Sequence, residues 1–308
     1  MSSLDFLIWL ERFRHPVTDA VAVAFSAAGS EVAYMVLLTI IYLCVGHRFG
    51  FHLFVVFLLA AFSNGLLKHA FATLRPFKMY ADQLHPLYVQ SGTGPAFPSG
   101  HAQNAATTWG VIAIRQRGRR RQIAAVVMIL GIALSRLYCQ VHWPADVIGG
   151  LCIGGLSVVL YLFVLGAWKS GGRRLEAANG ALLVVAVSAS MYLAGAGNRV
   201  CVTSAGAALG CGLGFILLEL RGGYNARAPI LTQLVKIVVA LAVLLGLRTG
   251  AKLILGSGEP ADYLRYALIG FTCAYVLPAF FAGFHNWTRR ARKSMEMLQK
   301  ETADRDTR

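Results

Sequence analysis

Residues 51–73 read FHLFVVFLLAAFSNGLLKHAFAT, and the fold class follows from this run. The run is apolar along nearly its whole length until Lys68 and His69. A helix of about 20 mostly apolar residues is long enough to cross the hydrocarbon core of a bilayer. The run therefore predicts a membrane-spanning helix that carries a lysine close to one end, and the fold class is predicted to be all-α, a polytopic bundle of membrane helices.

Similar apolar runs recur along the rest of the chain. Of its 308 residues, 56% are hydrophobic and 14% are charged, whereas soluble domains carry about 25% charged residues. We predict eight further spans, at 19–46, 99–114, 122–139, 144–167, 178–197, 199–219, 230–250 and 263–284. The first of these could be two pieces, because Gly29, Ser30 and Glu31 interrupt it.

These spans divide the chain into four predicted segments. Residues 1–18 form an interfacial N-terminal segment, in which 3–14 resemble an amphipathic helix lying at the membrane surface. Residues 19–167 form a core of about five spans, and 168–285 a C-terminal transmembrane extension of about four. Residues 286–308 form a polar cytoplasmic tail. No cleavable signal peptide is expected, because residues 1–15 lack a basic region ahead of an apolar one.

The positive charge is distributed in a way that indicates membrane topology. The net charge is +15, and the basic residues gather in short clusters between the apolar runs: Arg115, Arg117, Arg119, Arg120 and Arg121; Lys169, Arg173 and Arg174; and Arg289, Arg290, Arg292 and Lys293. Such clusters are typical of cytoplasmic loops, whereas a nucleic-acid-binding protein carries a basic stripe on a soluble face. The partners predicted are therefore the bilayer and a lipid, with no nucleic acid.

The same clusters assign each loop to a side of the membrane. Loops 47–50, 115–121, 168–176 and 220–229, together with the C-terminal tail, are predicted to face the cytoplasm. The segments on the opposite side are then 74–98, 140–143, 198 and 251–262. This arrangement predicts a multi-pass protein of the plasma or inner membrane, with its N-terminus outside and its C-terminus inside.

Three short segments border the outer face and carry the residues from which we expect chemistry. In chain order they are Lys68-x6-Arg75-Pro76, Pro98-Ser99-Gly100-His101 and Ser135-Arg136-x5-His142-x3-Asp146. The topology brings all three to the same membrane surface, although the segments themselves do not require it. Long loops in compact domains tend to be functional, and the outer loop at 74–98 joins the first segment to the second.

The residue types in these segments fit a bound phosphate. Lys68, Arg75 and Arg136 would place three cations together, which is costly unless an anion neutralises them. The planar fork of arginine suits phosphate oxygens. Ser99 and Gly100 stand where a helix begins, and the free N–H groups at a helix N-terminus bind anions.

His142 and Asp146 complete a site for phosphoryl transfer. If a helix begins near Pro144, the carboxylate of Asp146 can turn back to one imidazole nitrogen of His142 and leave the other free to attack phosphorus. His101 remains as the general acid for the leaving oxygen. Between residues 32 and 175 the only acidic residues are Asp82 and Asp146, too few for a two-metal site. No metal and no cofactor is therefore expected.

At these residues the chain resembles the type-2 phosphatidic acid phosphatase superfamily, which includes undecaprenyl pyrophosphate phosphatases, glucose-6-phosphatase and vanadium haloperoxidases. The resemblance covers about residues 20–167, with every defining position matched. It implies a helical catalytic core, a covalent phosphohistidine on His142, His101 and Asp146 as catalytic partners, and a phosphate-binding role for Lys68, Arg75, Ser99, Gly100 and Arg136.

The extension lies outside this resemblance. Its clearest feature is a stripe of small residues, Gly206, Gly210 and Gly214, which suits close helix packing. A similar pair, Gly150 and Gly154, lies in span 144–167. The two stripes could face each other within one chain or form a homodimer, and the sequence does not choose between these arrangements.

The leading functional hypothesis is metal-independent hydrolysis of a lipid phosphate or pyrophosphate at the outer face. Phosphatidic acid, phosphatidylglycerol phosphate and undecaprenyl pyrophosphate all fit, with the lipid tail reaching the site laterally between helices. One alternative is a phosphotransferase that passes the phosphoryl group to a lipid acceptor, which product analysis with and without that acceptor would detect. Another is a lipid-transport or docking protein coupled to the core, which truncation after about residue 170 would test. The membrane setting argues against a haloperoxidase-like use of the pocket.

Overall fold

The computed structural model describes residues 2–92, 94–116, 118–167 and 173–284, and this part of the chain is built of helices with no strand. The all-α fold class is therefore confirmed. Up to the end of the predicted core, the elements are α1 (Ser3–Glu11), α2 (Pro16–Ala28), α3 (Glu31–Ile40), η1 (Ile41–Val45), α4 (His47–Phe71), α5 (Pro76–Met79), η2 (Val89–Ser91), α6 (Gly100–Arg115), α7 (Arg119–Tyr138) and α8 (Pro144–Ala167).

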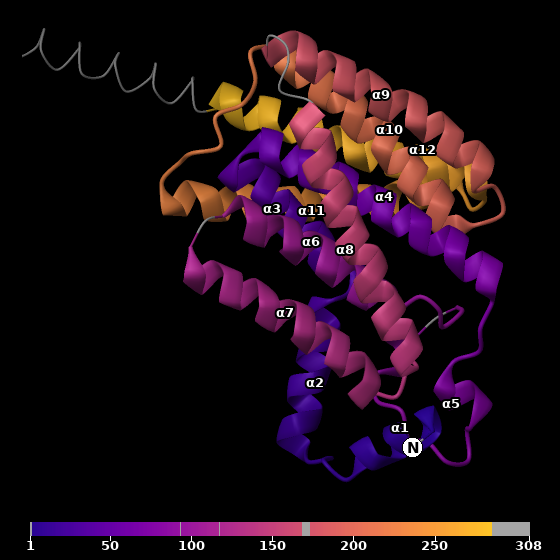
Figure 1. Cartoon of the computed structure of the whole chain (residues 1–308). Helices are drawn as coiled ribbons and strands as arrows, with labels where there is room; N and C mark the ends of the chain where they lie inside the picture. Colours follow the sequence, from indigo (N-terminus) through magenta and orange to yellow (C-terminus); the bar gives the residue numbers. More distant parts are fainter. Residues whose placement is uncertain (1, 93, 117, 168–172, 285–308) are drawn as a thin grey trace, which may run out of the picture.

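The extension is a second group of helices. It comprises α9 (Arg173–Ala194), α10 (Arg199–Leu220), α11 (Ile230–Leu255), α12 (Glu259–Phe271) and η3 (Thr272–Val276). In Figure 1, α9, α10 and α12 lie together beside α4, with α11 crossing behind. The predicted tail at 286–308, and the basic residues Lys169 and Arg289 to Lys293, lie outside the described residues.

Most of the predicted spans are helices that can cross a membrane. Within the described residues, six are long and apolar enough to do so singly, and the pair 16–28 and 31–45 makes a seventh if it is counted as one broken span. The chain is thus a multi-span membrane protein. The predicted spans 99–114 and 178–197 are also helical, as α6 and α9, but neither meets this criterion on its own. Helix α6 has 16 residues and carries buried polar side chains such as Gln103 and Thr107. It can carry them because it packs inside the bundle against α4, α7 and α8.

The first predicted span is broken where its sequence suggested. Helices α2 and α3 meet at an angle of 59°. Ser30 caps the N-terminus of α3, and its Oγ accepts a hydrogen bond from the backbone N–H of Ala33 at 3.3 Å. At Gly29 a Cβ atom would lie 2.7 Å from Cγ2 of Ile132 and 2.9 Å from Cδ2 of His101. The break therefore brings the chain against α7 and against a predicted catalytic residue.

Helix α6 lies at the centre of the predicted core, packed against α4, α7 and α8. Two glycines of α8 permit this contact. A Cβ at Gly150 would lie 2.5 Å from the carbonyl oxygen of Ser99, and one at Gly154 would lie 2.6 Å from that of Gln103. Gly150 and Gly154 thus allow the N-terminal half of α6 to pack directly against α8.

The glycine stripe of α10 packs against α12 of the same chain. A Cβ at Gly210 would overlap the carbonyl oxygen of Ala267, and one at Gly206 would overlap that of Tyr263. The two small-residue stripes therefore do not face each other, because each packs on a different helix within the chain. Helix α10 also reaches the core: the Nδ2 of Asn198 donates to the carbonyl oxygen of Gly65 in α4 at 2.8 Å.

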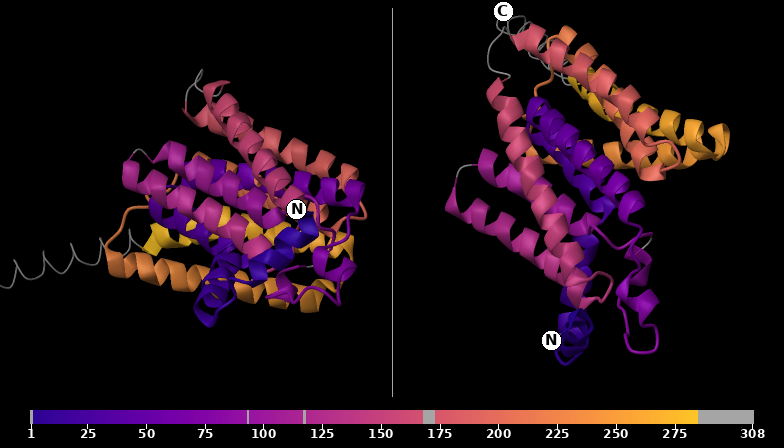
Figure 2. Two further views of the ribbon diagram at one scale, coloured as in Figure 1. Left: turned by 60° about the horizontal axis from the view of Figure 1, so that its bottom comes forward. Right: turned by 45° about the vertical axis from the view of Figure 1, so that its right-hand side comes forward.

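The loops separate into two groups at opposite ends of the bundle. At one end, the guanidinium of Arg115 lies 6.0 Å from the centre of the Phe49 ring, and Nε2 of His47 lies 2.8 Å from Oε1 of Glu219. At the other end lie the last turn of α4, the loop up to Ser99, and the turn between α7 and α8. Loops assigned to one predicted side are thus brought together at one end, and the motif residues lie at the other, near α1 and α5 (Figure 2).

Candidate active site

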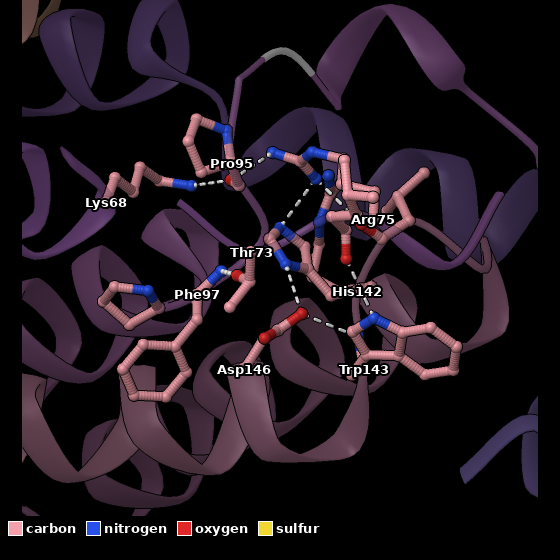
Figure 3. A network of polar contacts seen from close by, with 12 residues as sticks. Lys68, Thr73, Arg75, Pro95, Phe97, His142, Trp143 and Asp146 are labelled. Atoms are coloured by element: carbon pink, nitrogen blue, oxygen red, sulfur yellow. Dashed lines mark hydrogen bonds and ion pairs between the residues drawn. The ribbon is translucent and has the colours of Figure 1, made fainter. Parts of the chain in front are cut away.

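Three cations converge at the end of the bundle that carries α5. Lys68, in the last turn of α4, donates from Nζ to the carbonyl oxygen of Pro95 at 2.5 Å. Arg75, which precedes α5, donates from Nε to Gly94 O at 2.9 Å and from Nη2 to Pro95 O at 3.3 Å. Figure 3 shows both side chains directed at the same carbonyl. The carbonyl oxygens that accept these bonds are neutral, and phosphate oxygens would accept them more strongly.

Arg136 is the third cation. It lies in the last turn of α7, is 0% exposed, and donates from Nη1 to the hydroxyls of Ser26 and Ser91. Its Nη2 donates to the carbonyl oxygen of Ser91 at 3.3 Å. A fully buried guanidinium is costly without polar partners, and α2 and η2 supply them here.

His142 lies between Arg75 and Asp146 in the turn that joins α7 to α8 (Figure 3). Its Nε2 is 3.0 Å from Nη1 of Arg75, and its Nδ1 is 3.3 Å from Oδ2 of Asp146. A guanidinium can only donate, so Nε2 must be the unprotonated nitrogen in this contact. The imidazole is then neutral, with its proton on Nδ1 facing the carboxylate of Asp146.

Burial and charge keep His142 neutral. The side chain is 1% exposed. Burial lowers the pKa of His142 well below its ordinary value, and the nearby positive charges of Arg75, Arg136 and Lys68 lower it further. A histidine in this state presents a lone pair at neutral pH, which a nucleophile requires.

Asp146 is held in place by the start of α8. Its Oδ2 accepts from the backbone N–H of Trp143 at 2.8 Å, in addition to the contact with His142. Its own carbonyl oxygen accepts from the backbone N–H of Ser99 at 2.9 Å. One residue therefore fixes the turn that bears His142 and also ties α8 to the N-terminus of α6.

The N-terminus of α6 presents groups that are buried without partners. Oγ of Ser99, Nε2 of His101 and, on the neighbouring α7, Nε of Arg136 are among the buried side-chain atoms that have no hydrogen-bond partner within the described residues. Ser99 precedes the helix, yet its side chain makes no capping bond. Gly100 lies against α4, where a Cβ would be 3.1 Å from Oδ1 of Asn64. Buried polar groups are nearly always paired, so these atoms fit a site that receives an anion.

The structure therefore brings together the eight predicted site residues: Lys68, Arg75, Ser99, Gly100, His101, Arg136, His142 and Asp146. They come from the ends of α4, α6, α7 and α8, from the loop before α5 and from the turn between α7 and α8. Their separate roles remain predictions from the sequence.

Four further residues support the site and were not among those predicted. Asn64 donates from Nδ2 to Oε1 of Gln103 at 2.8 Å and to the carbonyl oxygen of Pro98 at 3.3 Å. These buried amides join α4 to α6 beside Ser99. Ser26 and Ser91 hold Arg136. A polar amide inside an apolar run could have indicated Asn64, whereas nothing near Ser26 or Ser91 in the sequence points to Arg136.

A cavity of about 700 Å³ opens beside the carboxylate of Asp146. Its walls are largely aromatic and aliphatic and include Phe71, Leu74, Tyr80, Phe97 and Trp143. The Trp143 ring is fixed by a bond from Nε1 to the carbonyl oxygen of Leu74 at 3.0 Å and by edge-to-face contact with Tyr80. Trp143 is thus a wall of this cavity, next to the predicted nucleophile.

A second, smaller cavity lies further along α4 and α8, away from the site. It has a volume of about 270 Å³ and is lined by apolar residues of α4 and α8, among them Val55, Leu59, Ile153 and Leu156. The first cavity is lined by Phe71, the last residue of α4, and by Ala145, near the start of α8. Both cavities therefore lie along the seam between α4 and α8.

No set of ligands for a metal is assembled in the part of the chain that the structure describes, since it holds no group of three or more His, Cys, Asp or Glu side chains placed for one. His85, in the loop between α5 and η2, is exposed, and its Nδ1 lies 3.3 Å from Oε1 of Glu11.

Two models of known protein families match this chain. A model described as the PAP2 superfamily matches residues 49–170. A second, described as the PAP2 superfamily phosphatase transmembrane extension, matches residues 202–289. Together the matches span most of the chain, including every predicted site residue. The chain belongs to the PAP2 superfamily.

Individual relatives are more distant. An undecaprenyl-diphosphatase of Sulfolobus acidocaldarius is 30% identical over 35% of this chain and 50% of its own length. A phosphatidylglycerophosphatase B of Bacillus subtilis is 31% identical over 33% of this chain and 50% of its own length. The chain thus spans about half the length of these curated relatives. The crystal structure of a transmembrane PAP2-type phosphatidylglycerolphosphate phosphatase from Bacillus subtilis has a TM-score of 0.47 at 22% identity, covering 55% of this chain and 87% of its own.

Proposed function

We propose that this protein hydrolyses a lipid phosphate or pyrophosphate through a phosphohistidine on His142, without a metal, at the extracytoplasmic face of the plasma membrane. The observation that carries the proposal is the pairing of a neutral His142 with three converging cations. Nε2 of His142 faces Arg75, Nδ1 faces Asp146, and Lys68 and Arg75 direct their donors to one carbonyl oxygen. This is the set of groups that phosphoryl transfer requires, namely a nucleophile and fixed positive charge for the phosphoryl oxygens.

The reaction takes place in two steps. Nε2 of His142 attacks phosphorus and the bond from phosphorus to the leaving oxygen breaks. His101, which is protonated once the phosphate anion is bound beside it, gives that oxygen its proton. A positive charge develops on the imidazole of His142 during the attack. Asp146 stabilises this charge by accepting a hydrogen bond from the Nδ1–H of His142. Water then attacks the phosphohistidine, His101 takes the proton of that water, and the P–N bond breaks to release inorganic phosphate. Lys68, Arg75, Arg136 and the N-terminus of α6 hold the phosphoryl oxygens throughout.

The cavities support an amphiphilic substrate. The larger one provides apolar walls directly beside Asp146, and the smaller one continues along α4 and α8. A phosphate bound by the cations would leave its uncharged portion against Phe97 and Trp143, with a hydrocarbon chain following the seam. The relatives that carry names of lipid phosphatases are consistent with this substrate class.

The outward orientation is supported by the distribution of charge. The site lies at the end of the bundle opposite Arg48, Arg115 and Arg221, and clusters of arginine favour the cytoplasmic side. A cysteine in place of Lys78, an exposed residue of α5, should therefore react with an impermeant thiol reagent in intact cells. A cysteine in place of Arg120 is the control that should not react. The reverse labelling pattern would overturn the orientation.

The decisive experiment measures phosphate release by purified full-length protein in detergent with EDTA, for wild type and His142→Ala. Substrates are phosphatidic acid, phosphatidylglycerol phosphate, undecaprenyl pyrophosphate and glucose 6-phosphate. We expect release from one or more of the lipids, lost in the variant, with an acid-labile phosphoenzyme trapped only in the wild type. Release that persists in His142→Ala, or that requires a divalent metal, would refute the mechanism, and equal release from glucose 6-phosphate would refute the lipid preference.

A further inference from the structure

Helix α1 is docked onto the catalytic end of the bundle. Leu7 is 0% exposed and packs in a cluster with residues of α6, α7, α8 and the outer loop: Ala102, Ala133, Leu137, Val147 and Leu84. Figures 1 and 2 show α1 at the same end as α5 and near the turn between α7 and α8. Its first residues, Ser3 and Leu4, also line the large cavity beside Asp146. An amphipathic helix that only rested on the membrane surface would need none of these contacts.

The turn between α7 and α8 contains a residue in an unfavourable backbone conformation. Gln140, two residues before His142, has a φ of 56° and is 0% exposed. Left-handed backbone costs a residue with a side chain about 1–2 kcal/mol, so surrounding contacts must hold it there. The next residue, Val141, is bonded through its carbonyl oxygen to Nη1 of Arg75 at 2.8 Å. The conformation at Gln140 therefore sets the position of the peptide that leads into His142.

Helix α1 supplies the contacts that hold Gln140. Its Nε2 donates to the carbonyl oxygen of Leu7 at 3.1 Å and to Oε1 of Glu11 at 2.9 Å. Oε1 of Glu11 also accepts from the backbone N–H of His85 at 3.2 Å. Burial raises the pKa of Glu11, but hydrogen bonds from Gln140 and His85 outweigh it and leave the pKa below its usual value. The carboxylate is therefore charged at neutral pH and makes a strong acceptor.

We propose that Glu11 and Gln140 are positioning residues for the nucleophile, so that α1 is a working part of the active site. This inference rests on the proposed function. Glu11 fixes the side chain of Gln140, which holds the turn in its left-handed conformation, and the turn aims Nε2 of His142 at phosphorus. The side chains of Lys68 and Arg136 lie on α4 and α7 and bond to Pro95, Ser26 and Ser91 rather than to this turn. Of the three cations, Arg75 bonds to the turn through the carbonyl oxygen of Val141. Loss of the contact should therefore reduce the chemical step far more than it reduces substrate binding.

The test compares kcat and KM for full-length wild type and four variants. Glu11→Ala removes the acceptor, and we expect kcat to fall about tenfold to a hundredfold with KM within about twofold, since a misplacement near 1 Å can cost a hundredfold in rate. Glu11→Gln keeps an oxygen for Gln140 and should restore most of kcat. Gln140→Gly suits the left-handed backbone but loses both bonds, so kcat should fall although thermal stability is kept. Arg12→Ala, at an exposed neighbour of Glu11, should match wild type.

A merely structural role would give different results. It predicts that Gln140→Gly is fully active and that any loss in Glu11→Ala follows a loss of folded protein. Wild-type kcat in both Glu11→Ala and Gln140→Gly would overturn the inference while leaving the proposed function standing. A wild type that releases phosphate from no lipid would instead overturn the proposed function.

A second measurement does not depend on turnover. Diethyl pyrocarbonate modifies neutral imidazoles, and peptide mass spectrometry can follow His142 separately from the other histidines. Because His142 is 1% exposed, we expect slow modification in wild type, Arg12→Ala and Glu11→Gln, and modification at least fivefold faster in Glu11→Ala, in accordance with a turn that is no longer held. An unchanged rate in Glu11→Ala would overturn the positioning role whatever the activity.

Discussion

The guanidinium of Arg75 donates to the nitrogen of His142 that faces away from Asp146, with 3.0 Å between Nη1 and Nε2. The lone pair that would attack phosphorus is therefore already engaged by an arginine that we propose binds the phosphate. For attack to occur, Nη1 has to leave Nε2, and an incoming phosphate offers it stronger acceptors than an imidazole. The same contact explains how the site can hold a reactive imidazole in a defined tautomer before substrate arrives.

This relationship predicts the result of replacing Arg75 with lysine. Arg75→Lys keeps the charge but loses the fork that reaches Nε2 of His142 and the carbonyl oxygens of Gly94 and Val141. We expect kcat/KM for a lipid phosphate to fall by about 10²–10³, the usual effect of removing one donor to a developing oxyanion. Steady-state kinetics would show this, with Arg12→Lys, at an exposed position, as the control. Full activity in Arg75→Lys would show that charge alone suffices.

The lowered pKa of His142 predicts an unusual pH dependence. An ordinary histidine gains a proton, and loses its lone pair, as pH falls through about 6.5. Burial and then Arg75 lower the pKa of His142, so its lone pair should persist below pH 6.5, and phosphoenzyme formation should decline only at more acidic pH. Single-turnover labelling between pH 4 and 8 measures this, and a decline centred near 6.5 would contradict it.

The same shift has a consequence for stability. With a folded-state pKa below the unfolded value, the unfolded chain binds more protons as pH falls below about 6.5. The free energy of unfolding should therefore decrease as pH falls through that range, and His142→Gln should reduce this slope. Urea-induced unfolding in detergent at pH 7 and pH 5 would compare the two proteins. Identical slopes would mean that His142 is not held neutral.

The sequence indicated which polar residues would come together in space, but it did not indicate the residues that hold them there. Lys68, Arg75 and Arg136 could be predicted because ionisable groups near membrane depth require a partner, and the spacing of His142 and Asp146 brings both to the start of one helix. By contrast, Ser26 and Ser91 contact Arg136 only because α2 and η2 meet it in space. Contacts between segments far apart in the chain leave no local pattern.

In the fold, too, the helices with a local sequence pattern could be predicted, whereas the contacts between distant segments could not. Apolar runs predicted α4, α7, α8, α10 and α11, and the interruption at Gly29 and Ser30 predicted the break between α2 and α3. Helix α6 is less apolar than a typical span because its polar side chains, such as Gln103, are buried against neighbouring helices. The docking of α1 could not be predicted, since its amphipathic sequence suits a membrane surface and a protein surface equally well.

Close packing between α8 and α6 should be essential for activity. A Cβ at Gly150 would lie 2.5 Å from the carbonyl oxygen of Ser99, whereas a Cβ at Gly155, further along the same helix, would have no atom within 4 Å. Gly150→Ala should move the N-terminus of α6 away from His142 and cost about 1–3 kcal/mol from overpacking, with activity falling at least tenfold. Gly155→Ala should be neutral or slightly stabilising, because alanine favours helix. Phosphate release and thermal unfolding would be measured on both, and equal behaviour would refute the packing argument.

The glycine stripe of α10 distinguishes packing within the chain from packing between chains. A Cβ at Gly210 would overlap the carbonyl oxygen of Ala267 in α12, whereas one at Gly246 in α11 meets nothing within 4 Å. Gly210→Ala should therefore separate α10 from α12 and lower the thermal unfolding midpoint of the purified protein, and Gly246→Ala should not. Because the partner helix belongs to the same chain, light scattering should give the same oligomeric state for both variants and wild type. If the stripe packs within the chain, the overlap with Ala267 can be relieved only by weakening the contact between α10 and α12, so the unfolding midpoint must fall. A change of oligomeric state in Gly210→Ala with no change in the unfolding midpoint would instead assign the stripe to a homodimer interface.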